Sequence, residues 1–226
     1  MASIGNCPCL ESTESMRWTY KEGLLIASHP VMVHSLGAEM QVWVNVEVPE
    51  DLKSGSGLAG SPKFVPPHPR PSAKQRDAWH QFDNVRPEQM RQMLADGLRR
   101  LADRMDGVPP GSEPEFGPVH CPEEVSKASR NAASMLDGCT IQEVPGCQWS
   151  HMMIPHQQDA PVHFVLLHFT IASDVRPPWG YELEALFADA QVVFIGEDSG
   201  LWTRTEWEYD FNAPSFDPAT AAHPYW

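Results

Sequence analysis

The sequence predicts an α+β fold, with a mainly antiparallel sheet and two longer helices and one short helix packed on it. Three observations predict this class. Residues 40–48 alternate between apolar and polar side chains, which is typical of a strand with one buried face. Residues 87–106 repeat apolar side chains at helical spacing. The expected strands and helices do not alternate regularly along the chain, which disfavours a doubly wound parallel sheet.

The first strands are expected between residues 24 and 48. Residues 24–34 are aliphatic and β-branched, but Pro30 interrupts them. Because proline has no N–H for a ladder hydrogen bond, this segment is an edge strand or two short strands. In 40–48, Met40, Val42 and Val44 share one face, and Pro49 ends the strand.

A long loop rich in proline and glycine is expected at residues 51–73. It contains Ser-Gly-Ser-Gly at 54–57 and five prolines between 62 and 71. The fifty residues before it hold too few strands to form a core of their own. We therefore expect a loose N-terminal arm at 1–20 and a single domain at 21–226.

Three helices are expected after this loop. In 87–106, Pro87 suits the first turn, Asp83 or Asn84 precedes it, and Gly107 ends it. A second helix covers 122–137 and stops at Gly138. A short third helix is expected at 180–190, because apolar residues recur there at helical spacing: Leu183, Leu186, Phe187 and Ala190.

The remaining strands are expected in the second half of the chain. Residues 162–172 are apolar on both faces and predict a central buried strand. Residues 191–195 and 201–211 predict a hairpin around the glycine-bounded loop 196–200. Together with 40–48, these strands are expected to share one sheet that carries helix 87–106.

Composition excludes several classes of protein. The formal net charge of −14 disfavours binding to a nucleic-acid backbone. No apolar run reaches the ~20 residues of a membrane helix, and the first ten residues lack the pattern of a secretory signal. Five cysteines in 226 residues favour free thiols in a reducing compartment. The expectation is a soluble, cytoplasmic protein without a cofactor.

The acidic charge is concentrated near the C-terminus. Residues 174–226 hold ten acidic and two basic residues, whereas 63–104 hold nine basic and five acidic ones. In strand 201–211 one face carries apolar side chains and the other carries Trp202, Arg204, Glu206, Glu208 and Asp210. We expect this acidic strip to face solvent as a protein-binding surface. The alternative is that helix 87–106 covers the strip with its arginines: Arg91, Arg99, Arg100 and Arg104.

Histidines and cysteines form two further candidate sites. His120, Cys121, Cys139, Cys147, His151 and His156 lie close in sequence, but without the paired Cys-x2-Cys spacing of a zinc knuckle. We expect no tightly bound zinc there, although these residue types can ligate a metal. His163 and His168 are five apart on the expected central strand, so they point to opposite faces and are expected to be core or rim residues.

Two functions remain open at this point. The sequence lacks the nucleophile elbow, the phosphate loop and the His-Glu-x-x-His motif. The first hypothesis is a small acidic protein-binding module, of the inhibitor or immunity type, that sequesters a basic partner. The alternative is a hydrolase that uses clustered carboxylates with a histidine, with or without a metal. An enzyme needs a pocket where polar groups converge, whereas a binder needs an exposed acidic and aromatic patch.

Overall fold

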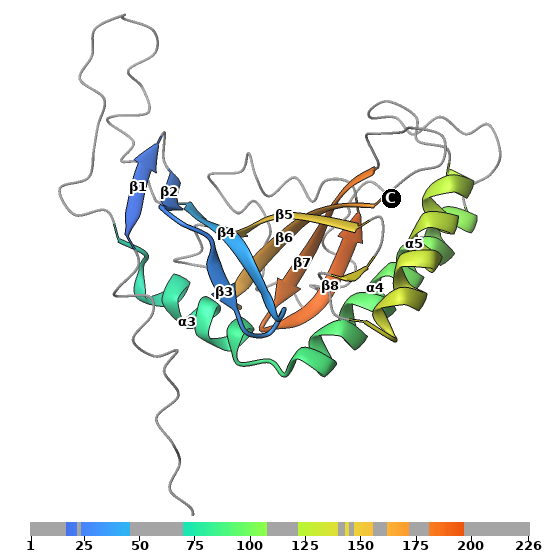
Figure 1. Cartoon of the computed structure of the whole chain (residues 1–226), viewed down its shortest axis with the longest axis horizontal. Coiled ribbons are helices and arrows are strands. Elements are labelled where there is room, and N and C mark those ends of the chain that lie inside the picture. Colours follow the sequence, from blue (N-terminus) through green and yellow to red (C-terminus); the bar gives the residue numbers. More distant parts are fainter. Residues whose placement is uncertain are drawn as a thin grey trace, which may run out of the picture.

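The structure is a mixed sheet of eight strands with three helices among the described residues (Figure 1). This computed structural model describes residues 17–21, 24–45, 70–107, 122–139, 143–144, 147–155, 162–171 and 181–196. The strands lie in the order β1-β2-β4-β5-β6-β7-β8, and β3 pairs with β4 off this path. The β4–β5 pair is parallel and the other pairs are antiparallel. The predicted α+β class is therefore confirmed.

The elements have the following bounds. The strands are β1 (Trp18–Lys21), β2 (Leu24–Ala27), β3 (Val31–Val33), β4 (Ala38–Asn45), β5 (Cys147–Ile154), β6 (Phe164–Ile171), β7 (Tyr181–Ala188) and β8 (Gln191–Gly196). The helices are α3 (Ala73–Asp83), α4 (Pro87–Asp106) and α5 (Pro122–Leu136).

The three helices all lie in the connection between β4 and β5. A parallel strand pair requires such a crossover, and the crossover places its helices on one face of the sheet. Figure 1 shows α3, α4 and α5 following one another along the same side of the strands. The described helices therefore cover one face of the sheet, and the opposite face carries separate side-chain clusters.

Several predictions from local sequence are confirmed. Helix α4 covers the expected 87–106, and α5 matches 122–137 to within one residue. Pro30 separates two short strands, β2 and β3, and the buried side chains of β4 are those of the predicted face. Strand β6 is buried at seven of its eight positions and lies between β5 and β7. The described parts of the expected strands 40–48, 162–172 and 191–195 belong to β4, β6 and β8, which share one sheet.

The short helix expected at 180–190 was wrong, because these residues form strand β7 and the turn after it. The segment pairs with β6 on one side and with β8 on the other. The full ladder with β6 and the partial ladder with β8 outweigh the helical preference of its Glu, Leu and Ala residues, which amounts to only tenths of a kcal/mol per residue.

The short helix of the fold is α3 instead. It begins at the end of the expected loop, where Ser72 and Gln75 form a reciprocal capping box. Asp83 is the last residue of α3 and does not cap α4. The N-cap of α4 is Arg86, whose side chain makes no capping hydrogen bond. Strand β5 was also not expected, and it occupies much of the segment treated as a histidine–cysteine cluster.

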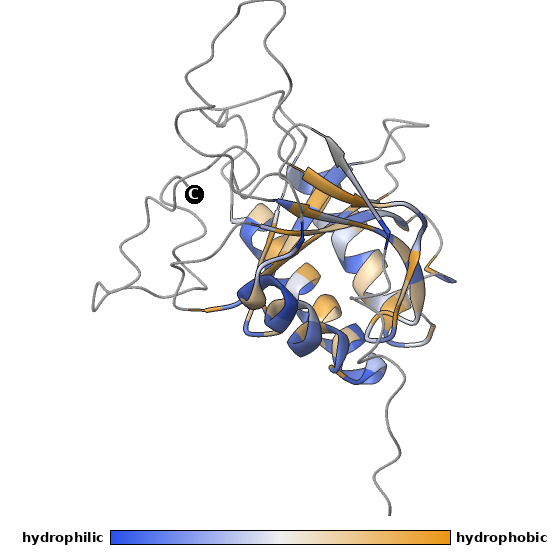
Figure 2. Ribbon diagram, turned by 90° about the vertical axis from the view of Figure 1, so that its left-hand side faces the viewer, coloured by the Kyte–Doolittle hydropathy of each residue, from blue (hydrophilic) through white to orange (hydrophobic). Residues whose placement is uncertain are grey.

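Two apolar clusters hold the described elements together. The larger one lies between the helices and the sheet and draws on residues from Leu25 to Ile195. The smaller one combines Met153, Phe164, Leu166, Leu186, Ala188 and Phe194 from β5 to β8. Figure 2 shows the strands largely in hydrophobic colours and the helices largely in hydrophilic ones. Among the described helices, none is long and apolar enough to span a membrane.

Candidate functional site

The predicted acidic strip lies outside the described residues. This applies to strand 201–211 as a whole and to its five expected binding residues: Trp202, Arg204, Glu206, Glu208 and Asp210. The N-terminal arm up to residue 16 and the loop up to residue 69 also lie outside them. Residues 18–21, at the end of the expected arm, form β1.

The histidine–cysteine cluster is only partly described. Cys139 follows α5 and Cys147 begins β5, and both are free thiols. Burial, together with the nearby Cys139, raises the pKa of Cys147 to about 11. The Cys147 thiol is therefore protonated at neutral pH, which makes it a poor nucleophile.

His120, Cys121 and His156 of that cluster lie outside the described residues. Within the described ranges, no three or more His, Cys, Asp and Glu side chains form a group that could hold a metal ion.

A row of four polar or aromatic side chains crosses the sheet on the face away from the helices. Trp43 on β4 stacks on His151 on β5, with ring centroids 3.9 Å apart. The His151 ring in turn stacks on that of His168 on β6, at 4.3 Å. His168 Nδ1 lies 3.3 Å from Oε1 of Glu184 on β7. His168 and Glu184 are both buried, at 9% and 3% exposure.

A β-bulge in β5 produces this row. The pairing with β6 shifts between Trp149 and His151, so Trp149 opposes Phe169 and His151 opposes His168. Residues two apart on a regular strand share one face, but here Trp149 packs into the larger cluster while His151 stacks on the opposite face.

Burial determines the charge state of the two histidines. Desolvation lowers the pKa of His151 to about 4. Desolvation and the neighbouring His151 lower the pKa of His168 to about 3. Both rings are therefore neutral at pH 7. A general base works best when its pKa lies near the operating pH, so neither histidine is tuned for that role at neutral pH.

His163 lies apart from this row. The sequence predicts this separation, because residues five apart on a strand, such as His163 and His168, point to opposite faces. It precedes β6, where its Nδ1 lies 3.1 Å from Asp189 Oδ1 and 3.1 Å from Gln81 Nε2. Its backbone N–H donates to the same Asp189 oxygen at 2.9 Å. These contacts fix the turn between β7 and β8, so His163 is a rim residue, as the sequence suggested.

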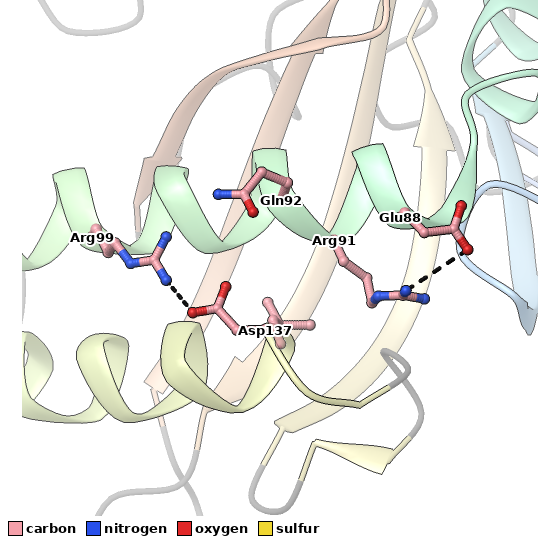
Figure 3. A pocket seen from close by; sticks show the side chains of 6 residues that line it. Glu88, Arg91, Gln92, Arg99 and Asp137 are labelled. Carbon is pink, nitrogen blue, oxygen red and sulfur yellow. Dashed lines mark hydrogen bonds and ion pairs between the residues drawn. The ribbon is translucent and has the colours of Figure 1, made fainter.

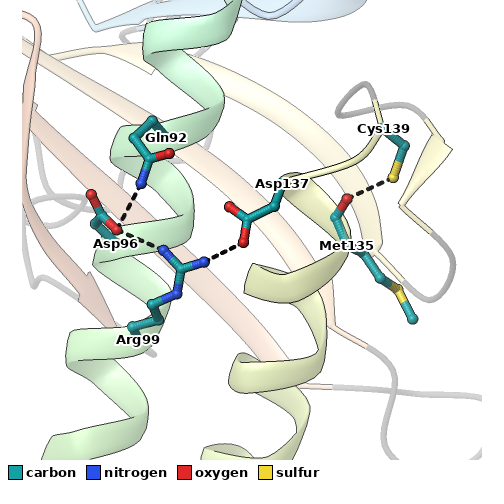
Figure 4. A network of polar contacts seen from close by, with 6 residues as sticks. All are labelled: Gln92, Asp96, Arg99, Met135, Asp137 and Cys139. Atoms are coloured by element: carbon teal, nitrogen blue, oxygen red, sulfur yellow. Dashed lines mark hydrogen bonds and ion pairs between the residues drawn. The ribbon is translucent and has the colours of Figure 1, made fainter.

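The arginines of α4 contact partners within the fold. Arg99 donates to Asp96 at 2.7 Å and to Asp137 at 2.5 Å, and so joins α4 to the end of α5 (Figure 4). Arg100 donates to the backbone carbonyl of Val192 at 3.2 Å. Arg104 donates to the carbonyl of Ile195, and its guanidinium lies 5.2 Å from the centre of the Phe194 ring.

A polar pocket of about 460 Å³ lies between α4 and the end of α5 (Figure 3). Its lining is Glu88, Arg91, Gln92, Arg99, Leu136 and Asp137. Arg91 and Arg99 are among the arginines that the sequence offers as possible cover for the acidic strip, but the sequence does not predict this pocket. The contact between the two helices creates it, and no local sequence signal marks that contact.

No protein-family model matches this chain, and no curated protein or solved structure matches it either.

Proposed function

We propose that this protein is an acidic cytoplasmic protein-binding module, of the inhibitor or immunity type, that sequesters a basic partner. Its binding surface consists of Trp202, Arg204, Glu206, Glu208 and Asp210. Charged and aromatic residues side by side favour a protein interface, because the charges steer the encounter and the aromatic ring supplies contact area.

The observation that carries this proposal is the set of partners around the arginines of α4. If α4 were to neutralise the acidic strip, its arginines would need to be available for it. Three of its four arginines instead have hydrogen-bonded partners: Arg99 contacts two carboxylates, and Arg100 and Arg104 donate to carbonyls of β8. Among the described residues, the fourth, Arg91, has only the distant Glu88 carboxylate at 3.8 Å. These contacts favour the external partner over the internal alternative.

The distribution of charge gives further support. The described residues carry 12 basic and 14 acidic side chains, whereas the rest of the chain carries 4 and 16. The sheet and its helices are therefore close to neutral, and nearly all of the net charge of −14 belongs to the other segments. A concentrated negative field raises association rates with basic proteins, and salt screens this effect.

Charge reversal tests the proposal. The variant Glu206→Lys, Glu208→Lys, Asp210→Lys is compared with a control variant, Glu39→Lys, Asp77→Lys, Glu182→Lys, whose three positions are exposed and described. Each variant changes the net charge by the same amount. A difference in partner binding between the two variants therefore depends on where the charges lie and not on the total charge.

The two variants and the wild type are used to capture proteins from the native host, and the captured protein is then purified and titrated. We expect a basic partner whose association with the wild type slows between about 50 and 500 mM salt. The strip variant should lose binding by at least about tenfold and keep its melting temperature, while the control binds normally. Equal binding by the strip variant, or a large drop in its melting temperature, would contradict the proposal.

The hydrolase alternative assigns catalysis to Glu206, Glu208 or Asp210 with a histidine. Among the described residues, the neighbouring His168 and Glu184 give it some support, since a carboxylate beside a histidine is a common arrangement for acid–base catalysis. The low pKa of His168 makes it a weak base, which is why we favour binding. An assay of glycoside and ester hydrolysis from pH 3 to 8, with His168→Gln as comparison, tests this alternative. Activity that rises above pH 3 and is lost in the variant would support it.

A further inference from the structure

The pocket between α4 and α5 is large enough for a small molecule. Its volume of about 460 Å³ falls in the range of about 300–1,000 Å³ that ligand pockets occupy. Five of its six lining residues are polar or charged. Figure 3 shows Arg91 and Arg99 extending from α4 toward the end of α5, with Asp137 between them.

The two arginines of this pocket differ in how their charges are satisfied. The Arg99 guanidinium lies 2.7 Å from Asp96 and 2.5 Å from Asp137, so two carboxylates already share its donors. The Arg91 side chain is 26% exposed, and its nearest carboxylate, that of Glu88, lies 3.8 Å away. The guanidinium of Arg91 makes no hydrogen bond to the described residues.

A partly buried arginine side chain whose one ion pair is long and exposed favours binding of an anion. Removing a charge from water costs free energy unless an opposite charge and hydrogen bonds replace the water. Glu88 provides little compensation, because it is 75% exposed and beyond hydrogen-bond distance. An incoming anion would therefore gain the donors that Glu88 leaves unused.

We infer that this pocket binds a small organic carboxylate, whose carboxyl group pairs with Arg91. The planar guanidinium offers two parallel N–H donors that match the two oxygens of a carboxylate. Glu88 and Asp137 also line the pocket, so a singly charged carboxylate suffers less repulsion there than a doubly charged phosphate. The body of the ligand lies along the alkyl parts of the arginines and Leu136.

The test compares benzoate, benzamide and inorganic phosphate as probes for the full-length protein. Benzamide has the shape of benzoate without its charge, and phosphate has charge without the carboxylate shape. Binding is followed by NMR titration. Benzoate should shift the signals of residues 88–92 and 136–137, and it should bind at least about tenfold more tightly than benzamide or phosphate.

Variants separate the role of Arg91 from general charge effects. Arg91→Gln should weaken benzoate binding by about tenfold or more, and Arg91→Lys should weaken it less. Glu88→Gln should strengthen binding, because it removes a competing carboxylate. Lys74→Gln on α3, which makes the same change in charge as Arg91→Gln but outside the pocket, should have no effect.

The inference is overturned if benzoate does not bind, if phosphate binds more tightly, or if Arg91→Gln folds normally and binds benzoate as well as the wild type does. These outcomes are independent of the acidic strip, because none of the substitutions lies in residues 201–211.

Discussion

The imidazole rings of His151 and His168 lie face to face across β5 and β6, with an interplanar angle of 12°. The two residues are direct partners in the strand register, with a bulge immediately before His151. Two stacked rings can stay this close when both are neutral, whereas two imidazolium rings would repel each other. The stack therefore predicts how the stability of the protein depends on pH.

Acidification should destabilise the protein well above the pH at which carboxylates titrate. The folded pKa values of His151 and His168 are lowered to about 4 and about 3, below the ~6.5 of an unfolded chain. The unfolded chain therefore binds more protons between about pH 6.5 and 4, and stability falls as the pH decreases through this window. For the buried His168 the loss should reach about 3 kcal/mol at pH 4.

Urea unfolding at pH 7, 6, 5 and 4 measures this dependence. The variant His168→Gln should flatten the slope, whereas His29→Gln at an exposed position should leave it unchanged. A slope that is identical in the wild type and His168→Gln would show that the stack does not control the acid response.

The turn between β7 and β8 should be stabilised by glycine at one position only. Asp189 and Ala190 have φ angles of 45° and 60°, in the left-handed region that residues with a Cβ rarely adopt. Ala190→Gly relieves this strain and should raise the free energy of unfolding by about 0.5–1 kcal/mol.

Asp189→Gly is the matched comparison for this turn. It relieves the same kind of strain but removes the carboxylate that accepts the N–H of His163, so it should destabilise the protein. Chemical denaturation of both variants checks the difference in sign, and equal effects would refute the role given to Asp189.

Gly97 should be required where α4 packs on β8. A Cβ at this position would lie 2.7 Å from Cδ1 of Ile195 and 3.0 Å from Cγ1 of Val192. Alanine in a helix is favoured over glycine by about 1 kcal/mol, but overpacking costs about 1–3 kcal/mol. Gly97→Ala should therefore lower stability on balance.

The double variant Gly97→Ala, Ile195→Val tests the mechanism, because valine lacks the Cδ1 atom that clashes. We expect it to be more stable than the sum of the two single changes predicts, by at least about 0.5 kcal/mol in thermal or urea unfolding. Simple additivity would place the cause of the destabilisation elsewhere.

Asp83 should be important for stability, although the sequence suggests only a helix cap. Its Oδ1 accepts the backbone N–H of His34 at 2.6 Å, and its Oδ2 lies 3.0 Å from Nδ1 of the same residue. This buried carboxylate connects the end of α3 to the turn after β3. Asp83→Ala should cost about 1–3 kcal/mol, because it leaves a backbone donor unsatisfied. Asp77→Ala, exposed on the same helix, should cost much less in the same unfolding experiment.

Part of the fold follows from short stretches of sequence. Pro87, Gly107 and the apolar stripe between them define α4, because caps and periodicity act within one helix. Alternation defines β4 for the same reason. The signal for α3 is also local, in the Ser72–Gln75 capping box, but its apolar stripe is short, with only Ala78, Trp79 and Phe82 in an otherwise polar segment.

The remaining features depend on residues far apart in the chain. Residues 181–188 become a strand because β6 and β8 flank them, and their own sequence favours a helix. In sequence, His151 belongs to the histidine–cysteine cluster and His168 to the central strand. Only the bulge in β5 and the strand register bring their rings together. The pocket around Arg91 exists because α5 ends beside α4.

The sequence by itself determined the α+β class, the limits of α4 and α5, the faces of β4 and β6, and the uneven distribution of charge. Only the tertiary structure decided the partners: Asp137 for Arg99, the carbonyl of Val192 for Arg100, and Glu184 for His168. The physical reason is the distance along the chain over which each kind of interaction acts. Caps and periodic patterns act over a few neighbouring residues, whereas register, bulges and helix packing decide which distant side chains meet.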